Sequence, residues 1–136
     1  MPLNPYLVFD GRCEAAFKFY EKVLRGKTDA IIRFSEMPQG GHAPANWGEK
    51  IMHVSMKIGD DRLMGSDAPP ERFKPMKGMW VALHVKEPAE AERTFHALAE
   101  KGAVEMPIQE TSWATRFGMV VDQFGTPWMV NCEKRS

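Results

Sequence analysis

The spacing of apolar residues divides the chain into two series of short strands, each with one helix after its first strand. In the first series, apolar and β-branched residues run without a helical period over four expected strands. These strands are residues 5–11, 28–37, 50–58 and 61–67. Residues 13–26 are instead expected to be a helix, with apolar positions at helical spacing and Gly26 as a stop signal.

The same order of elements returns after a Pro-rich stretch at 66–78. The expected helix covers residues 88–102, and the expected strands are 79–85, 104–110, 115–121 and 127–132. Pro88 suits the first helical turn, where its missing N–H has no partner to lose. Displacing one half by 76 positions aligns Phe9 with Val85, Phe19 with Phe95 and Gly26 with Gly102. We therefore predict one domain, residues 1–136, made of two modules at about 1–66 and 79–136.

Composition narrows the class of protein. The 136 residues are 43% hydrophobic and 26% charged, as in ordinary globular domains, and 18 basic residues balance 18 acidic ones. This balance offers no electrostatic site for nucleic acid or an anionic membrane. No apolar run reaches the length of about 18 residues that suggests a membrane span, and the N-terminus does not resemble a signal peptide, so a cytoplasmic protein is expected. Cys13 and Cys132 form no CxxC motif and are expected to be free thiols.

Three phrases carry a family resemblance: residues 5–20 (PYLVFDGRCEAAFKFY), 51–70 (IMHVSMKIGDDRLMGSDAPP) and 117–131 (FGMVVDQFGTPWMVN). Through them the chain resembles the PhnB-like branch of the vicinal oxygen chelate superfamily, which includes glyoxalases, extradiol dioxygenases, fosfomycin-resistance enzymes and bleomycin-binding proteins. The resemblance implies an α+β fold, with two βαβββ modules forming a curled mixed sheet around a cleft, the glyoxalase/bleomycin-resistance fold. The modules would pair within one chain or across a homodimer.

The resemblance also implies where a metal would bind. Metal-dependent relatives hold a divalent cation with four side chains, usually His and Glu, from the first and last strands of each module. The matching positions here are Asn4, Met64, Trp80 and Met129. Thioethers are poor ligands for hard divalent cations, and an indole offers only a donor N–H. We therefore expect no metal at this site, and no cofactor.

Alternation along the strands identifies candidate residues for the cleft. Leu7 and Phe9 are expected to pack on the helix, which leaves Tyr6 for the cleft, and the same alternation directs Trp80, His53 and His84 there. The two histidines could supply a general base near neutral pH, hold an atypical metal ion, or simply be half-buried and hydrogen-bonded to a neighbouring strand or to Tyr6. His42 and His96 are expected to be solvated.

Aromatic and sulfur-containing residues suit a pocket for a flat or apolar ligand. The candidate ligand-binding residues are Tyr6, Met64, Trp80, Trp113, Arg116 and Met129. Arg116 could clamp a carboxylate or phosphate, or could be an exposed strand residue without a role. Trp128 is expected in the core.

Two functions fit these residues. The first is a metal-free PhnB-like protein that binds a small organic ligand in its cleft and forms a homodimer. The alternative is a lyase-, isomerase- or transferase-type enzyme that uses His53 or His84 as a base or as ligands of a displaced metal. A scaffold kept only for assembly is a third possibility. The sequence has no GxGxxG, GxxxxGK[ST], GxSxG or HExxH motif, and no Gly-rich loop of the kind that holds S-adenosylmethionine.

Overall fold

The computed structural model describes residues 1–37 and 46–134. The chain forms two compact units, Met1–Pro75 and Met76–Ser136, divided within the Pro-rich stretch. Each unit has its own sheet and its own helix. His42 and most of the loop around it lie outside the described residues.

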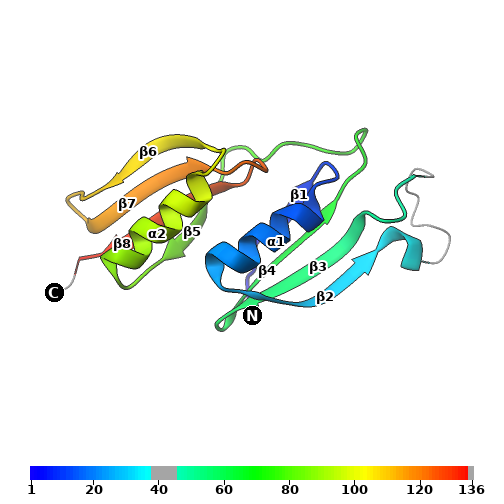
Figure 1. The fold of residues 1–136 in the computed structure, drawn as a ribbon, viewed down its shortest axis with the longest axis horizontal. Coiled ribbons are helices and arrows are strands. Elements are labelled where there is room, and N and C mark those ends of the chain that lie inside the picture. The colour runs from blue at the N-terminus through cyan, green and yellow to red at the C-terminus, as the bar shows by residue number, and fades with distance from the viewer. Residues whose placement is uncertain (38–45, 135–136) are drawn as a thin grey trace. The chain divides into compact units, whose positions relative to one another are not determined.

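The first unit places helix α1 against a four-stranded sheet (Figure 1). Its elements are β1 (Tyr6–Phe9), α1 (Cys13–Leu24), β2 (Lys27–Arg33), β3 (Ile51–Ile58) and β4 (Asp61–Asp67). The strand order is β1-β4-β3-β2, with β1 parallel to β4 and the other pairs antiparallel. The second strand is shorter than expected, because residues 34–36 form the 3₁₀ helix η1 (Phe34–Glu36), whose Glu36 carboxylate accepts the N–H of Arg33 at 2.8 Å.

The second unit repeats this arrangement. Its elements are β5 (Val81–His84), α2 (Pro88–Ala99), β6 (Ala103–Gln109), β7 (Ala114–Val121) and β8 (Pro127–Glu133), with strand order β5-β8-β7-β6. In both units the first strand, the helix and the three later strands have 4, 12, 7, 8 and 7 residues. This match in order and length confirms the predicted pair of βαβββ modules.

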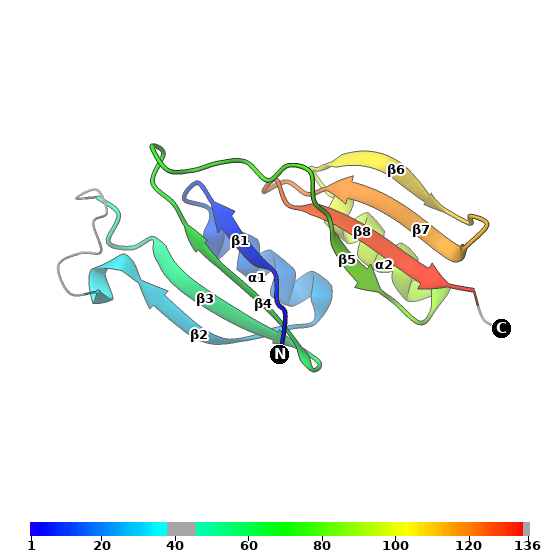
Figure 2. The same cartoon turned by 180° about the vertical axis from the view of Figure 1, so that it is seen from behind.

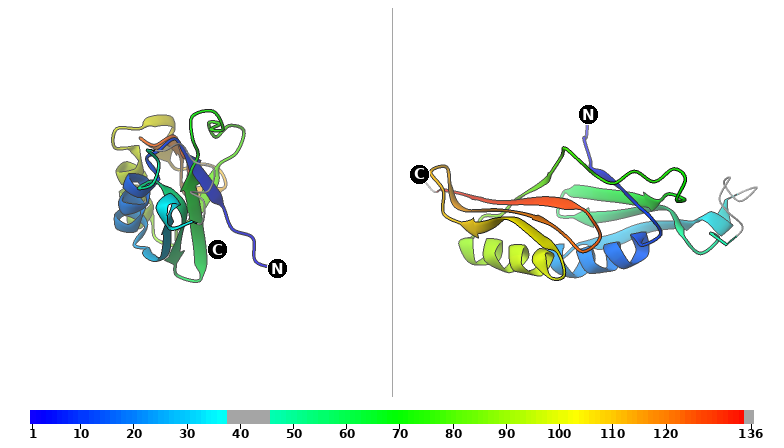
Figure 3. Two further views of the ribbon diagram at one scale, coloured as in Figure 1. Left: turned by 90° about the vertical axis from the view of Figure 1, so that its right-hand side faces the viewer. Right: turned by 90° about the horizontal axis from the view of Figure 1, so that it is seen from above.

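Each sheet packs one face on its helix and leaves the other face without one (Figures 2 and 3). The buried side chains of the first unit include Leu7, Phe9, Ala16, Phe17, Tyr20, Val54, Met56 and Leu63. Those of the second unit include Ala91, Phe95, Leu98, Val120, Trp128 and Val130. Alternation therefore assigns the residues between them on each strand to the helix-free faces.

A glycine in each sheet lets an aromatic ring of the helix approach the strands closely. A Cβ atom added at Gly65 would lie 2.7 Å from the carbonyl oxygen of Leu7 and 2.8 Å from the ring of Phe17. One added at Gly118 would lie 2.7 Å from the ring of Phe95. A side chain at either position would push the helix away from its sheet.

The helices depart from the repeat expected from the sequence. A displacement of 76 positions would pair Phe19 with Phe95, yet Phe19 is only half-buried while Phe95 is 2% exposed. A displacement of 75 positions pairs buried with buried: Ala16 with Ala91, Tyr20 with Phe95 and Val23 with Leu98. The sequence-based alignment is therefore wrong within the helices. The turns that lead into the two helices, residues 10–12 and 85–87, each have three residues.

The end of α1 also differs from expectation. The helix ends at Leu24, and the left-handed residue that follows is Arg25, with φ 56°, rather than Gly26. Gly26 is instead a position of close approach, since a Cβ atom there would lie 2.8 Å from the sulfur of Met56. The expected stop at Gly26 thus lies two residues beyond the observed end of the helix.

A buried carboxylate on β4 closes the start of α1. Asp67 Oδ1 accepts the N–H groups of Gly11 and Cys13, both at 2.9 Å, and Oδ2 accepts the N–H of Ile51 at 3.0 Å. Two of these donors belong to the turn into the helix and its first residue, where N–H groups lack partners within the helix. The second unit has one such donor fewer, because Pro88 begins its helix without an N–H.

A second buried carboxylate organises the turn between β7 and β8. Asp122 Oδ1 accepts the N–H of Phe124 at 2.8 Å and of Thr126 at 3.1 Å, and Oδ2 accepts the indole N–H of Trp128 at 2.8 Å. Gly125 supplies the positive φ of 93° that the turn requires. Trp128 is fully buried, as expected for a core residue.

Both cysteines are free and buried, as the sequence indicated. Burial raises the pKa of the Cys13 thiol well above its usual range, and the nearby carboxylates of Asp67 and Glu14 add to the increase. Cys13 is therefore a packing residue rather than a reactive thiol. In the described part of the chain, no helix has the length and hydrophobicity needed to span a bilayer.

Candidate functional site

The helix-free face of the first unit is defined by a row of residues across three strands. Tyr6 on β1 pairs with Met64 on β4, and Met64 pairs with Ser55 on β3. Partners in such a row point to the same side of a sheet, and so do residues two positions away along a strand. We call Tyr6, His53, Ser55, Arg62 and Met64 the first helix-free face.

Tyr6 and His53 form a pair on this face. The Tyr6 hydroxyl and His53 Nδ1 lie 3.1 Å apart, and the two rings stack at 5.7 Å between centroids with 26° between their planes. The contact fixes the imidazole through Nδ1, and the Nε2 atom makes no hydrogen bond with the described residues of the unit. This arrangement matches the expectation of a hydrogen-bonded histidine, and it would also orient a general base.

Arg62 crosses the same face. Its Nη1 atom donates to both carboxylate oxygens of Asp29 at 2.9 Å and to Ser55 Oγ at 2.5 Å. Ser55 is 4% exposed. The first helix-free face therefore combines an aromatic–imidazole pair with a polar network, and the thioether of Met64 lies beside both.

The helix-free face of the second unit has a different chemistry. Ala82 on β5 pairs with Met129 on β8, Met129 pairs with Met119 on β7, and Met119 pairs with Met106 on β6. Three thioethers thus lie in one row across the sheet, each half-buried. Such unbranched, polarisable side chains adapt to flat or irregular apolar ligands.

A second row completes this face. His84 pairs with Asn131, and Asn131 pairs with Phe117. Trp113, 58% exposed, packs edge-on against Phe117 with 5.3 Å between ring centroids. We call Ala82, His84, Met106, Phe117, Met119, Met129 and Asn131 the second helix-free face. Trp80 is half-buried and directly precedes β5.

The two histidines singled out by the sequence belong to different units. His53 is half-buried against Tyr6, and His84 is exposed, with Nδ1 at 3.5 Å from the amide nitrogen of Asn131. That the side chains of His53 and His84 share one cavity stays a prediction.

The strand pairing shows that Met64 and Met129 are equivalent positions. Met64 lies between Tyr6 and Ser55, as Met129 lies between Ala82 and Met119. Neither thioether is a ligand for a hard divalent cation, and Asn4 is an exposed amide that precedes β1. Among the described residues of each unit, there is no group of three or more His, Cys, Asp or Glu side chains that could hold a metal ion. The donors do not fit the cation that the superfamily uses.

Arg116 lies on the helix-packed side of the second sheet. Its Nε atom donates to Glu92 of α2 at 3.0 Å, and Nη1 donates to the carbonyl oxygen of Thr115 at 2.7 Å. Glu92 also contacts His96, whose side chain is 67% exposed, in line with the expected solvated histidine. Arg116 is therefore engaged with helix α2 and does not lie on the same face of the sheet as Met129.

A hollow of about 500 Å³ lies at one end of the second helix-free face. His84 and Asn131 contribute to its lining, together with the residues that lead from β5 into α2. Arg62 and Asn131 were both missed in the sequence. The signal was present, because each lies two residues from a candidate methionine and so shares its face.

The chain contains two βαβββ units, and each sheet has one helix-covered face and one helix-free face. This is the architecture that the superfamily resemblance implied. Comparisons with known proteins agree. A family model described as 3-demethylubiquinone-9 3-methyltransferase matches residues 2–131. This chain belongs to that family.

Individual relatives support the same conclusion. Protein YjdN of Escherichia coli (strain K12) is 36% identical over 143 residues, covering 99% of this chain and 97% of that protein. The crystal structure of PA1353 from Pseudomonas aeruginosa is 44% identical, with a TM-score of 0.90 and 99% of each chain covered.

More distant structures show the fold. The PhnB protein from Bacillus cereus is 22% identical with a TM-score of 0.80, covering 97% of this chain and 99% of that one. A glyoxylase/bleomycin resistance protein/dioxygenase domain from Frankia sp. EAN1pec is 12% identical with a TM-score of 0.67, covering 96% and 94%. The PhnB-like resemblance and the glyoxalase/bleomycin-resistance fold are thereby confirmed.

Proposed function

We propose that this protein binds a small organic molecule on its helix-free faces and does so without a catalytic metal ion. The observation that carries the proposal is the equivalence of Met64 and Met129, which lie at matching places on the last strands of the two units. A Lewis-acidic cation needs oxygen or imidazole donors, whereas thioethers and aromatic rings suit apolar ligand surface. The row of Met106, Met119 and Met129 extends that surface across the second sheet.

Methyl transfer, which the family description names, is not part of this proposal. Methyltransferases hold S-adenosylmethionine in a Gly-rich turn between a strand and a helix. In the first unit the matching turn is closed, because the N–H groups of Gly11 and Cys13 both bond to Asp67. The residues present do not fit that cofactor.

Ligand binding can be followed at the methionine methyl groups. In protein labelled with ¹³C at these groups, a library of small neutral aromatic compounds is expected to shift the signals of Met129 and Met119. Met1, which is fully exposed, is the internal control. Compounds that shift all methionine signals equally, or none, would contradict the proposed binding surface.

A second candidate function is enzymatic, with His53 as general base. It is favoured by the Tyr6 hydroxyl at 3.1 Å from His53 Nδ1, which would orient Nε2 toward a substrate. For such an enzyme, replacing His53 by alanine would reduce turnover by about 100-fold or more. The binding proposal expects no turnover in either protein. Tyr6→Phe is the variant to compare with His53→Ala, because it removes the hydroxyl that contacts His53 and keeps the aromatic ring.

We also propose that the protein is a cytoplasmic homodimer. Among the described residues, β1 and β5 lie at the edges of their own sheets, and such edges are commonly covered by another chain. Sedimentation at micromolar concentration is expected to give twice the chain mass of 15.4 kDa. A mass near that of one chain would contradict the dimer.

A further inference from the structure

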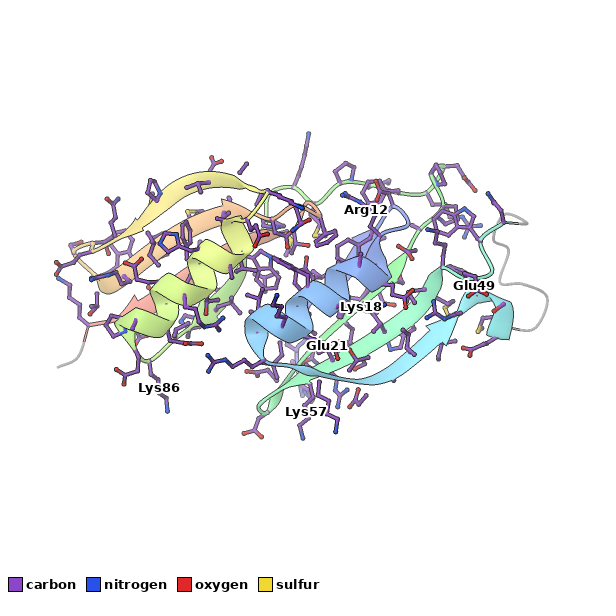
Figure 4. The ribbon with its side chains drawn as sticks, viewed as in Figure 1. Arg12, Lys18, Glu21, Glu49, Lys57 and Lys86 are labelled. Atoms are coloured by element: carbon purple, nitrogen blue, oxygen red, sulfur yellow. The ribbon has the colours of Figure 1, made fainter. Side chains whose placement is uncertain are left out.

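Three basic residues lie in one row across the first sheet. Lys27 on β2 pairs with Lys57 on β3, and Lys57 pairs with Arg62 on β4. Lys57 is two residues from Ser55 along β3, so the row lies on the first helix-free face. We call Lys27, Lys57 and Arg62 the basic row. Figure 4 shows Lys57 close to the hairpin between β3 and β4, whereas Lys18 is on helix α1.

The basic row places like charges side by side. Like charges at paired positions of neighbouring strands destabilise a sheet, and the row contains two such pairs. Lysines on an edge strand can protect it from aggregation, but β3 and β4 lie inside the sheet. Neither Lys27 nor Lys57 forms an ion pair with the described residues. A negatively charged group bound beside the row would relieve this repulsion.

Arg62 is held on one side and free on the other. Its Nη1 atom donates to the carboxylate of Asp29 and to the buried hydroxyl of Ser55. Its Nε and Nη2 atoms make no hydrogen bond with the described residues. These two nitrogens form the planar fork that matches two oxygens of a carboxylate or phosphate. The side chain is 38% exposed, so a ligand can reach the fork.

The acidic residues near the basic row do not cancel its charge. Asp29 is already bonded to Arg62. Asp60 lies in the turn after β3, and Asp61 has the same parity on β4 as the buried Leu63, on the helix-packed side. Among the described residues of the first unit, the helix-free side of this row therefore has an excess of positive charge.

A ring surface lies at a suitable distance from the fork. Arg62 reaches Ser55, and Ser55 is two residues from His53 along β3, or about 7 Å. His53 stacks on Tyr6, whose side chain belongs to a residue that is 47% exposed. The spacing is about the length of a small aromatic acid, so one ligand can contact the rings and the fork together.

We infer that the first helix-free face binds a ring-containing organic anion. Its carboxylate or phosphate group accepts hydrogen bonds from the free fork of Arg62 and lies beside the ammonium group of Lys57. Its ring lies against Tyr6 and His53. The inference rests on the proposed ligand-binding function and adds the chemical class of the ligand.

Benzoate and benzamide test this inference as a matched pair, because they share a ring and a planar group of similar size but only benzoate is charged. In titrations of the full chain, benzoate is expected to bind about tenfold more tightly than benzamide. It should shift the signals of the Met64 methyl group and of the Arg62 Nε–H group. Phenyl phosphate is the parallel arm, and the acid that binds more tightly identifies the anionic group. Equal affinities for benzamide and both acids would overturn the inference.

Lys57→Gln supplies the second readout, because it removes one charge of the row and leaves the contacts of Arg62 intact. It is expected to weaken benzoate binding by about threefold without changing the affinity for benzamide. Lys18→Gln removes the same charge from α1, on the other side of the sheet, and should change neither affinity. Arg62→Gln is expected to abolish the preference for the acids. A preference unchanged in either Lys57→Gln or Arg62→Gln would overturn the inference.

The same labelled protein separates this inference from the proposed function. Neutral compounds that shift Met129 and Met119, together with acids that leave Met64 and Arg62 unchanged, would overturn the inference and leave the proposed function standing. If neither the compound library nor the acids shifted any methionine signal selectively, the proposed function would be contradicted as well.

Discussion

Replacing Asp122 by alanine is expected to lower the free energy of unfolding by about 4 kcal/mol, since three hydrogen bonds to one buried carboxylate are lost together. The carboxylate accepts the N–H groups of Phe124 and Thr126 and the indole N–H of Trp128, and the aspartate is 4% exposed. In the variant these three donors lose the carboxylate as their acceptor. Urea unfolding followed by tryptophan fluorescence measures the loss.

Asp10→Ala is the matched control for this variant. Asp10 is also an aspartate in a turn, but its side chain is 43% exposed and its ion pair with Arg12 is on the surface. Surface pairs of this kind contribute about 0–1 kcal/mol. A loss below about 1 kcal/mol for Asp122→Ala, similar to the control, would mean that the carboxylate does not organise the turn.

The second large effect is expected at Asp67, where alanine should cost about 3 kcal/mol. The variant leaves the N–H groups of Gly11, Cys13 and Ile51 without their acceptor, so the start of α1 loses its cap. Hydrogen exchange at the amides of Cys13 and Ile51 should become faster. Protection equal to the wild type at both amides would contradict this role for Asp67.

The stability difference between the wild type and Asp67→Ala is also expected to depend on pH. Burial raises the pKa of Asp67. This effect of burial outweighs the three N–H donors and the charge of Lys50, which act to lower the pKa. Because the folded pKa lies above the unfolded value of about 3.9, the folded state binds the proton more tightly. The difference in unfolding free energy should therefore be largest below about pH 4 and decline as the pH rises through the folded pKa. A difference that grows over that range would contradict the direction of the shift.

The order of elements was predictable because each strand and helix carries its own periodicity. Alternation of apolar residues correctly placed Leu7 and Phe9 in the core and Tyr6 on the opposite face. The register of the helices was not predictable in this way. It depends on the position at which each helix begins relative to its first strand, and the three-residue turns before the helices leave no periodic signal in the sequence.

The residues of the candidate site were predictable only in part. The alternation that placed Met129 on the helix-free face would also have placed Asn131 there. In the same way, Arg116 lies four residues before the buried Val120 on β7, so alternation would have directed both side chains toward α2. The contact between Tyr6 and His53 was one of the alternatives that the sequence left open, but alternation alone does not establish it. It requires β4 to lie between β1 and β3, which is a property of the strand order.

The strand pairing also explains why the two faces differ. Ser55 on the first face is matched by Met119 on the second, and Tyr6 is matched by Ala82. Polar residues with Arg62 thus occupy one face, and a row of thioethers occupies the other. Only the methionines at 64 and 129 are common to both, at two of the positions where the family resemblance implies the ligands of metal-dependent relatives.

The metal content of the purified protein tests the central claim most directly. The protein would be produced in medium supplemented with zinc, manganese and nickel, purified without a chelator, and analysed by mass spectrometry of its elements. The account predicts far less than one divalent cation per chain, and no change when Met64 or Met129 is replaced by alanine. One cation per chain that is lost in either variant would contradict the account.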